Sequence, residues 1–182
     1  MATYPVYTLD SAPEQSRPVL RQLQEAFGRI PNIAGTMSAS PVLINGFIGV
    51  FQRVHSGNLT EAQLQTLLLT NAVTNACTWA VAFHTALALK EGLDPSDVQA
   101  IRERRVPKDE KHAALSNLSR TLIEKRGRLD DPDIAAFTAA GFAQESVLEV
   151  ILVVSASTIT NYAGSVTQPP LEPIFSEYAW EA

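Results

Sequence analysis

The stretch from Leu59 to Leu93, LTEAQLQTLLLTNAVTNACTWAVAFHTALALKEGL, decides the fold because it carries the signals of two consecutive helices. Thr60 and Gln63 have the spacing of a capping box, in which the threonine hydroxyl accepts from the amide of Gln63 and the glutamine side chain returns the bond. Apolar residues then recur at helical spacing. We therefore expect a helix that starts at Thr60 and ends near Thr74.

A second helix follows within the same stretch. Asn75 is a residue type that caps helix amino termini, and Gly92 is a type that ends helices. We expect this helix to run from Ala76 to about Glu91. The two helices are expected to pack as a hairpin.

The segments on either side also read as helices. The segment from Pro41 to Ser56 carries an apolar stripe at positions 43, 47, 50, 51 and 54, and Gly57 ends it. An Asp followed by Pro is a helix-start signal, and it occurs at Asp94-Pro95 and again at Asp131-Pro132. Short helices are therefore expected after each of these pairs.

A long apolar helix is expected from about Gln144 to Tyr162, with a stop at Gly164. The Pro-rich tail after it should lie extended across a surface. Residues 1–12 show no regular pattern. The sequence thus predicts an all-α protein with a single domain over residues 1–182 and a core at about 13–165.

Composition limits the classes of function. The chain has 182 residues, 46% of them hydrophobic and 18% charged, which suits one folded domain. Its net charge of -5, without a concentrated basic face, argues against nucleic-acid binding. The longest apolar run, Val147 to Val154, contains Glu149 and is too short for a membrane span, so we expect no membrane partner.

The expected location is the cytoplasm. The amino terminus lacks the basic and apolar regions of a secretory signal. The single cysteine, Cys77, cannot form an internal disulfide, which is typical of a reducing compartment.

Cys77 and His84 are the candidate chemical groups. In the first turn of the second helix, Cys77 would meet free amides and the positive end of the helix dipole, which lower a thiol pKa. The alternative is that it is a small buried residue, as free cysteines usually are. His84 lies two turns further on and could be a base or a buried core histidine. His55, at a helix end before Gly57, is expected to satisfy the last carbonyls of that helix, and an active-site role is the alternative.

Other catalytic classes are disfavoured. His112 lies in a charged linker, and no two histidines have the spacing of metal ligands. The sequence also has no glycine-rich phosphate loop and no nucleophile elbow.

The hairpin resembles the core of the AhpD-like alkylhydroperoxidase and carboxymuconolactone decarboxylase superfamily. That family has the pattern L-S/T-x4-E, eleven residues, C-x-Y-C-x3-H, then A-x4-G-L. The residues that carry the resemblance are Leu59-Thr60, Asn75-Ala76-Cys77-Thr78-Trp79-Ala80, His84 to Lys90, Gly92-Leu93, and upstream Ile30-Pro31-Asn32 and Ser40-Pro41. The resemblance therefore covers roughly residues 30–93.

The resemblance implies an AhpD-like helical bundle that assembles as a homo-oligomer, a dimer, trimer or hexamer, with its site near the start of the Cys helix. In the peroxidase branch of the family, a Glu and a His relay protons to a Cys pair that reduces peroxide. This chain departs twice from that pattern. The relay Glu falls on Gln65, which cannot accept a proton at working pH, and the second cysteine falls on Ala80.

Three functions stay open from the resemblance. The chain is expected to be a peroxidase-related protein with a degraded dithiol relay, at most a one-cysteine thiol peroxidase, with a site formed by Gln65, Cys77 and His84. The second possibility is a cofactor-free decarboxylase-like lyase acting on an anionic lactone, in which His84 is the base. The third is a catalytically silent oligomer that binds a small ligand. No cofactor or metal is implied by any of the three.

For the lyase, a cation would have to hold the carboxylates of the substrate. Arg53, Arg102 and Arg105 are the candidates, and Arg53, on the helix before the hairpin, is the best placed of them.

Overall fold

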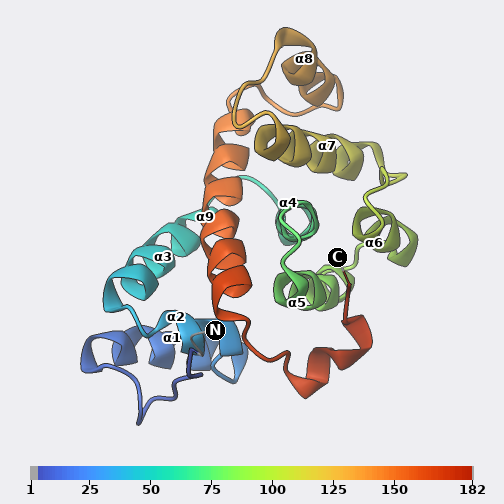
Figure 1. The fold of residues 1–182 in the computed structure, drawn as a ribbon. Helices are drawn as coiled ribbons and strands as arrows, with labels where there is room; N and C mark the ends of the chain where they lie inside the picture. The colour runs from blue at the N-terminus through green and yellow to red at the C-terminus, as the bar shows by residue number, and fades with distance from the viewer. Residues whose placement is uncertain (1–3, 182) are drawn as a thin grey trace.

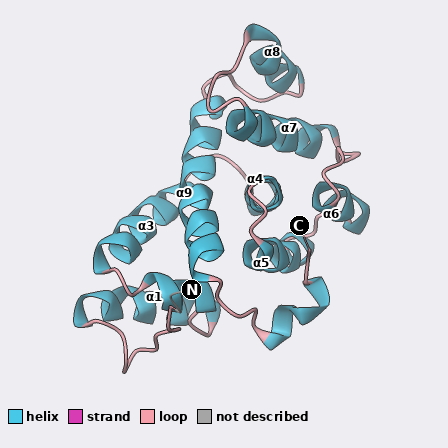
Figure 2. Ribbon diagram, viewed as in Figure 1, coloured by secondary structure: helices cyan, strands magenta, loops and turns pink. Residues whose placement is uncertain are grey.

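The structure is a computed structural model that describes residues 4–181. Over this range it is built from helices and loops, as expected for an all-α fold (Figure 2). The predicted hairpin is present: α4 (Glu61–Thr74) and α5 (Thr78–Lys90) follow each other in the chain and pack against each other. Thr60 caps α4 with the predicted capping box, because Gln63 N donates to Thr60 Oγ1 and Thr60 N donates to Gln63 Oε1.

The start of α5 differs from the prediction. Asn75 caps the carboxyl end of α4 rather than the start of α5, and its side-chain amide donates to Asn71 Oδ1 at 2.8 Å. Ala76 then adopts a left-handed conformation with φ of 53°, which turns the chain between the two helices. As a result Cys77 is the N-cap residue of α5, and the helix begins at Thr78.

The long helix α9 (Ser146–Thr167) runs through the middle of the molecule (Figure 1). The amino-terminal helices α2 (Asn32–Met37) and α3 (Pro41–Val54) contact it, with α1 (Arg17–Phe27) beside them. The hairpin and α7 (Glu110–Glu124) pack on the other side of α9.

The prediction that α9 stops at Gly164 is wrong. The helix continues to Thr167 and ends where Gln168 takes a left-handed conformation. Gly164 is buried inside the helix, where a Cβ atom would lie 2.8 Å from Cys77 Sγ. The glycine therefore serves close packing against the hairpin rather than helix termination.

At 22 residues with a mean hydropathy of 1.4, α9 is long and apolar enough to cross a membrane, contrary to the expectation that no such segment exists. However, it packs against α2, α3, α4 and α7, and it carries the buried polar residues Ser157 and Asn161. These contacts bury one face of the helix against the rest of the protein.

The remaining start signals place α6 (Pro95–Arg102) and α8 (Asp131–Ala139) close to the predicted positions. Asp94 caps α6 as expected, by accepting from Ser96 N. Asp130, one residue earlier than predicted, caps α8 in a second capping box. In α3, Ile44 is fully buried whereas Leu43, assigned to the apolar stripe, is exposed.

After α9 the tail turns back along the hairpin. The tail forms the 3-10 helix η2 (Pro173–Tyr178), which contacts α5. A second short 3-10 helix, η1 (Glu14–Ser16), lies before α1. Glu172 is buried and accepts from both Trp79 Nε1 and the Asn32 amide. The tail thereby holds the amino-terminal part of α5 against the start of α2.

Candidate active site

A cavity of about 220 Å³ opens between the hairpin, the amino-terminal helices and α9. Much of its wall is aromatic. Phe47 and Phe51 come from α3, Trp79 and Phe83 from α5, and Phe27 from α1. The polar side chains that line it include His55, Glu61, Gln65 and His84. The cavity thus combines an apolar body with a compact polar edge.

His84 and Gln65 meet at this edge. His84 Nδ1 lies 3.0 Å from Gln65 Oε1, and the two side chains come from α5 and α4. Because an amide oxygen only accepts, this contact places the proton on Nδ1 and leaves Nε2 as an acceptor. Burial, with a smaller contribution from the charge of His55, lowers the pKa of His84 to about 3, so the ring is neutral at physiological pH.

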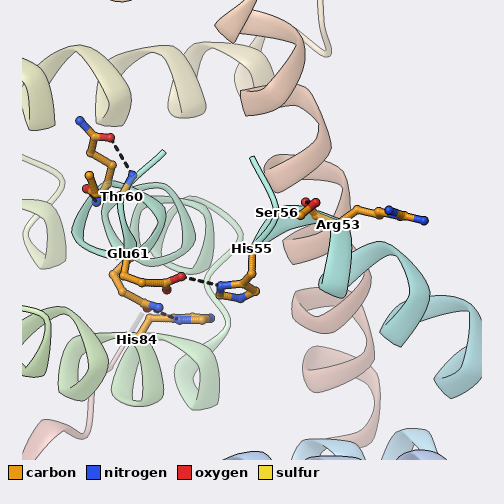
Figure 3. A network of polar contacts seen from close by, with 8 residues as sticks. Arg53, His55, Ser56, Thr60, Glu61 and His84 are labelled. Carbon is orange, nitrogen blue, oxygen red and sulfur yellow. Dashed lines mark hydrogen bonds and ion pairs between the residues drawn. The ribbon is translucent and has the colours of Figure 1, made fainter. Parts of the chain in front are cut away.

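His55 and Glu61 form a second pair at the mouth of the cavity. Glu61 Oε1 accepts from His55 Nδ1 at 3.0 Å, so the carboxylate fixes the orientation of the imidazole (Figure 3). His55 follows the end of α3 and packs edge-to-face on Phe51, with ring centroids 4.6 Å apart. Its Nε2 is then the ring nitrogen available to a bound molecule.

Cys77, predicted to share the site with Gln65 and His84, lies outside this cavity. Its side chain is 2% exposed, packs on Gly164 in α9, and borders a separate surface depression together with Gln168. Burial raises the pKa of the Cys77 thiol, and the amides of Ala80 and Trp79 only partly oppose this effect. The burial of Cys77 therefore agrees with the expectation of a small buried residue, and the direction of the pKa shift is opposite to the activation that a helix terminus would give.

The arginines considered as carboxylate-binding residues occupy other places. Arg53 points away from both histidines (Figure 3), and Arg102 donates to the carbonyls of Tyr178 and Ala179 in the tail. Arg105 forms an exposed ion pair with Glu103. The cation that does line the cavity is Lys90, near the end of α5.

Sequence reasoning did not place two residues of this edge in the site. His55 was expected mainly to satisfy the end of its helix, with an active-site role as the alternative, and Glu61 was treated as part of a helix start. One available signal was the spacing of Glu61 and Gln65, which at i and i+4 share one face of α4. The contact between Glu61 and His55 depends on how α3 meets α4, which no local pattern encodes.

The remaining histidine, His112, contacts Thr66 Oγ1 through Nδ1 at 2.7 Å, between α7 and α4. Within residues 4–181, no group of three or more His, Cys, Asp or Glu side chains is arranged to hold a metal ion.

Comparison with solved structures places this arrangement in a known fold. A peroxidase-related protein with an alkylhydroperoxidase AhpD core, from Ralstonia eutropha, superposes with a TM-score of 0.82 and covers 94% of this chain and 93% of its own. The chain has the AhpD-like fold. The two sequences are 17% identical, so the likeness concerns the fold.

Two further structures share the AhpD-like fold. A peroxidase-related protein from a Silicibacter species has a TM-score of 0.78 at 16% identity, covering 95% of this chain and 93% of its own. The debrominase Bmp8, as a Cys-to-Ala variant in complex with 2,3,4-tribromopyrrole, has a TM-score of 0.79 at 15% identity, covering 98% of this chain and 95% of its own. No protein-family model and no curated protein sequence matches the chain.

The AhpD-like fold therefore occurs with more than one chemistry, since a debrominase is among its members. The predicted AhpD-like fold is confirmed by these structures. In this chain, His55, His84 and Glu61 line the cavity, and the only thiol of the sequence is packed against α9.

Proposed function

We propose that this chain is a peroxidase-related protein in which the dithiol relay is lost and the cavity is the working site. Ala80 stands where a second cysteine is needed for a disulfide, and Gln65 stands where a carboxylate would relay protons. The observation that carries the proposal is that His55, Glu61, Gln65 and His84 line the cavity while Cys77 does not. The function is binding of a small organic molecule and proton transfer from it.

His55 is the proposed general base. Glu61 Oε1 accepts from His55 Nδ1, so Nε2 of the same ring is free to take a proton from the substrate. An N–H bond then forms at Nε2 as the bond between this proton and its substrate atom breaks. The imidazolium that results is stabilised by the Glu61 carboxylate. Solvent takes the proton from His55 afterwards, because the side chain of His55 is 30% exposed.

His84 and Gln65 have a different proposed role. A histidine with its pKa lowered to about 3 is a poor base but a stable neutral acceptor, so His84 Nε2 is suited to orient the bound molecule. The free amide hydrogens of Gln65 supply donors beside it. These two side chains therefore position the molecule, and His55 performs the chemistry.

A one-cysteine peroxidase is less well supported by the same site. The thiolate is the form that attacks peroxide, and burial raises the pKa of Cys77 and keeps its sulfur from solvent. The lyase alternative uses the proposed cavity, with Lys90 rather than an arginine as the cation that meets a carboxylate. We further propose a cytoplasmic homo-oligomer with a small-molecule ligand.

Ring opening of 5-nitrobenzisoxazole tests the base. A base removes the proton from C3, the N–O bond breaks, and its electrons leave on oxygen as a coloured phenolate. The wild type should catalyse this reaction, and Glu61→Gln and His55→Gln should each lower the rate at least about tenfold, since general-base catalysis contributes about 10²–10⁴-fold.

The controls are Arg53→Gln and Cys77→Ser. Arg53 lies on the same helix as the base site but points away from it, and Cys77 lies outside the cavity. Both variants should keep the wild-type rate. Equal rates for the wild type and His55→Gln would show that His55 is not the base and would overturn the proposal.

A further inference from the structure

We infer that the cavity takes a planar aromatic molecule that carries an O–H or N–H group on its edge, as phenols and azoles do. This inference rests on the proposed function, because it names the class of molecule on which that site acts. It is carried by three features of the cavity: its size, its aromatic walls and the hydrogen-bonding character of its polar edge.

The size of the cavity suits one substituted ring or a small fused pair of rings. An apolar protein cavity of about 150 Å³ holds a benzene molecule, and this cavity has about 220 Å³. Pockets for drug-sized ligands are larger, about 300–1,000 Å³. A long acyl chain or a nucleotide would therefore extend beyond the cavity.

The walls favour a flat ligand. Five of the twenty lining residues are Phe or Trp, whereas aromatic residues make up 7% of the chain. They form two groups, each next to a histidine. Phe51 packs on Phe47 and His55, and Phe83 stacks on Trp79 at 4.9 Å and meets His84 edge-on. A ring between these groups gains the offset and edge contacts that aromatic pairs prefer.

The polar edge favours a ligand that donates a hydrogen bond. Gln65 Oε1 accepts from the N–H of His84, so His84 Nε2 is an acceptor. Glu61 Oε1 accepts from His55 Nδ1, which leaves His55 Nε2 as the ring nitrogen that faces a ligand. His84 is 7% exposed, and an apolar or purely accepting ligand would leave its Nε2 desolvated without a partner. An O–H or N–H on the ring satisfies this acceptor.

Calorimetric titration with matched compounds tests the inference. 4-Methylphenol carries both features, 4-methylanisole lacks the O–H, 4-methylcyclohexanol lacks the aromatic ring, and 1-heptanol lacks both ring and planarity. We expect 4-methylphenol to bind about tenfold more tightly than 4-methylanisole, because a lost hydrogen bond that strands a buried acceptor has an effect of this order. It should also bind more tightly than the two alcohols, because they keep the O–H but lack the aromatic contacts with the cavity walls.

Variants tie that preference to the named side chains. His84→Phe removes the acceptor, so 4-methylphenol and 4-methylanisole should bind equally well. Gln65→Leu, which removes the partner that fixes the proton on Nδ1, is a second variant that should reduce the same preference. Cys77→Ala, outside the cavity, should keep the affinity of the wild type within about twofold.

The outcomes separate this inference from the proposed function. If 4-methylanisole or 1-heptanol binds the wild type as tightly as 4-methylphenol, the ligand class is wrong, and the same is true if nothing binds while base catalysis still depends on His55. If 4-methylphenol binds with the stated preference but base catalysis is independent of His55, the proposed function falls and the ligand class stands. A preference that persists in both His84→Phe and Gln65→Leu overturns the assigned acceptor.

Discussion

Acid should destabilise this protein through His84. Its pKa is lowered to about 3 by burial and, to a smaller extent, by His55, whereas a histidine in the unfolded chain titrates near 6.5. Between these pH values the unfolded state binds a proton that the folded state does not bind. The contribution of neutral His84 to stability is therefore complete above pH 6.5 and is lost progressively as the pH falls toward 3.

The size of this effect follows from the pKa difference. Each pH unit within the window lowers the free energy of unfolding by up to about 1.4 kcal/mol, so acidification from pH 7 to pH 5 should cost about 2 kcal/mol. That is a large share of the stability of a domain, typically about 5–15 kcal/mol. His84→Phe keeps an aromatic ring beside Phe83 but cannot be protonated, so it should abolish this share of the pH dependence.

Urea unfolding at pH 7, 6 and 5, followed by tryptophan fluorescence, measures the effect. The wild type should lose about 2 kcal/mol more than His84→Phe between pH 7 and pH 5. Gln65→Leu is the matched control, because it removes the hydrogen-bond partner but leaves the histidine titratable, and it should keep the steep dependence. If the wild type and His84→Phe lose stability in parallel, His84 is not held neutral, and its assignment as an acceptor is refuted.

Four further predictions concern the thiol, the tail and the assembly. Gly164→Ala should lower the free energy of unfolding by about 1–2 kcal/mol, because its Cβ would lie 2.8 Å from the Cys77 sulfur, and adding Cys77→Ala should recover most of that loss in urea unfolding. Arg102→Met should release the tail carbonyls, so limited proteolysis should cut the tail several-fold faster than in the wild type. Ala80→Cys with Gln65→Glu should restore a dithiol, read as a free-thiol count that falls by two under peroxide, and a count that stays constant would contradict it. Light scattering at micromolar concentration should give at least the mass of a dimer, and a strictly monomeric mass would contradict the proposed assembly.

Local sequence signals predicted most of the helices because those signals act within one turn. The capping box at Thr60 and the Asp cap of α6 depend only on neighbouring residues, and both are present. The prediction that Asn75 caps the start of the second helix was wrong because Asn can cap either end of a helix. In the structure, Ala76 forms a left-handed turn between α4 and α5, so Asn75 ends α4 and Cys77 becomes the N-cap of α5.

Gly164 shows the limit of the same reasoning. A glycine at the end of an apolar run usually marks a helix stop, but here the missing side chain leaves room for Cys77 and Ile33. This is a contact between segments far apart in the sequence. It also explains why the Cys77 thiol, although it lies at the start of α5, is packed against α9.

The candidate site was predicted in part. Gln65 and His84 were identified from their spacing in the family pattern, and the structure places them 3.0 Å apart. His55 and Glu61 were missed because their contact forms where the end of α3 meets the start of α4. Composition and periodicity describe each helix, whereas a cavity edge depends on how three of them meet.

Peroxide consumption coupled to dithiothreitol, measured for the wild type and Cys77→Ser side by side, tests most directly whether the thiol chemistry is lost. We predict that both proteins consume peroxide at the same background rate, because the sulfur is buried, its pKa is raised and it has no second cysteine to pair with. A wild-type rate clearly above background that disappears in Cys77→Ser would contradict the account, and Cys77 rather than the cavity would then be the working group.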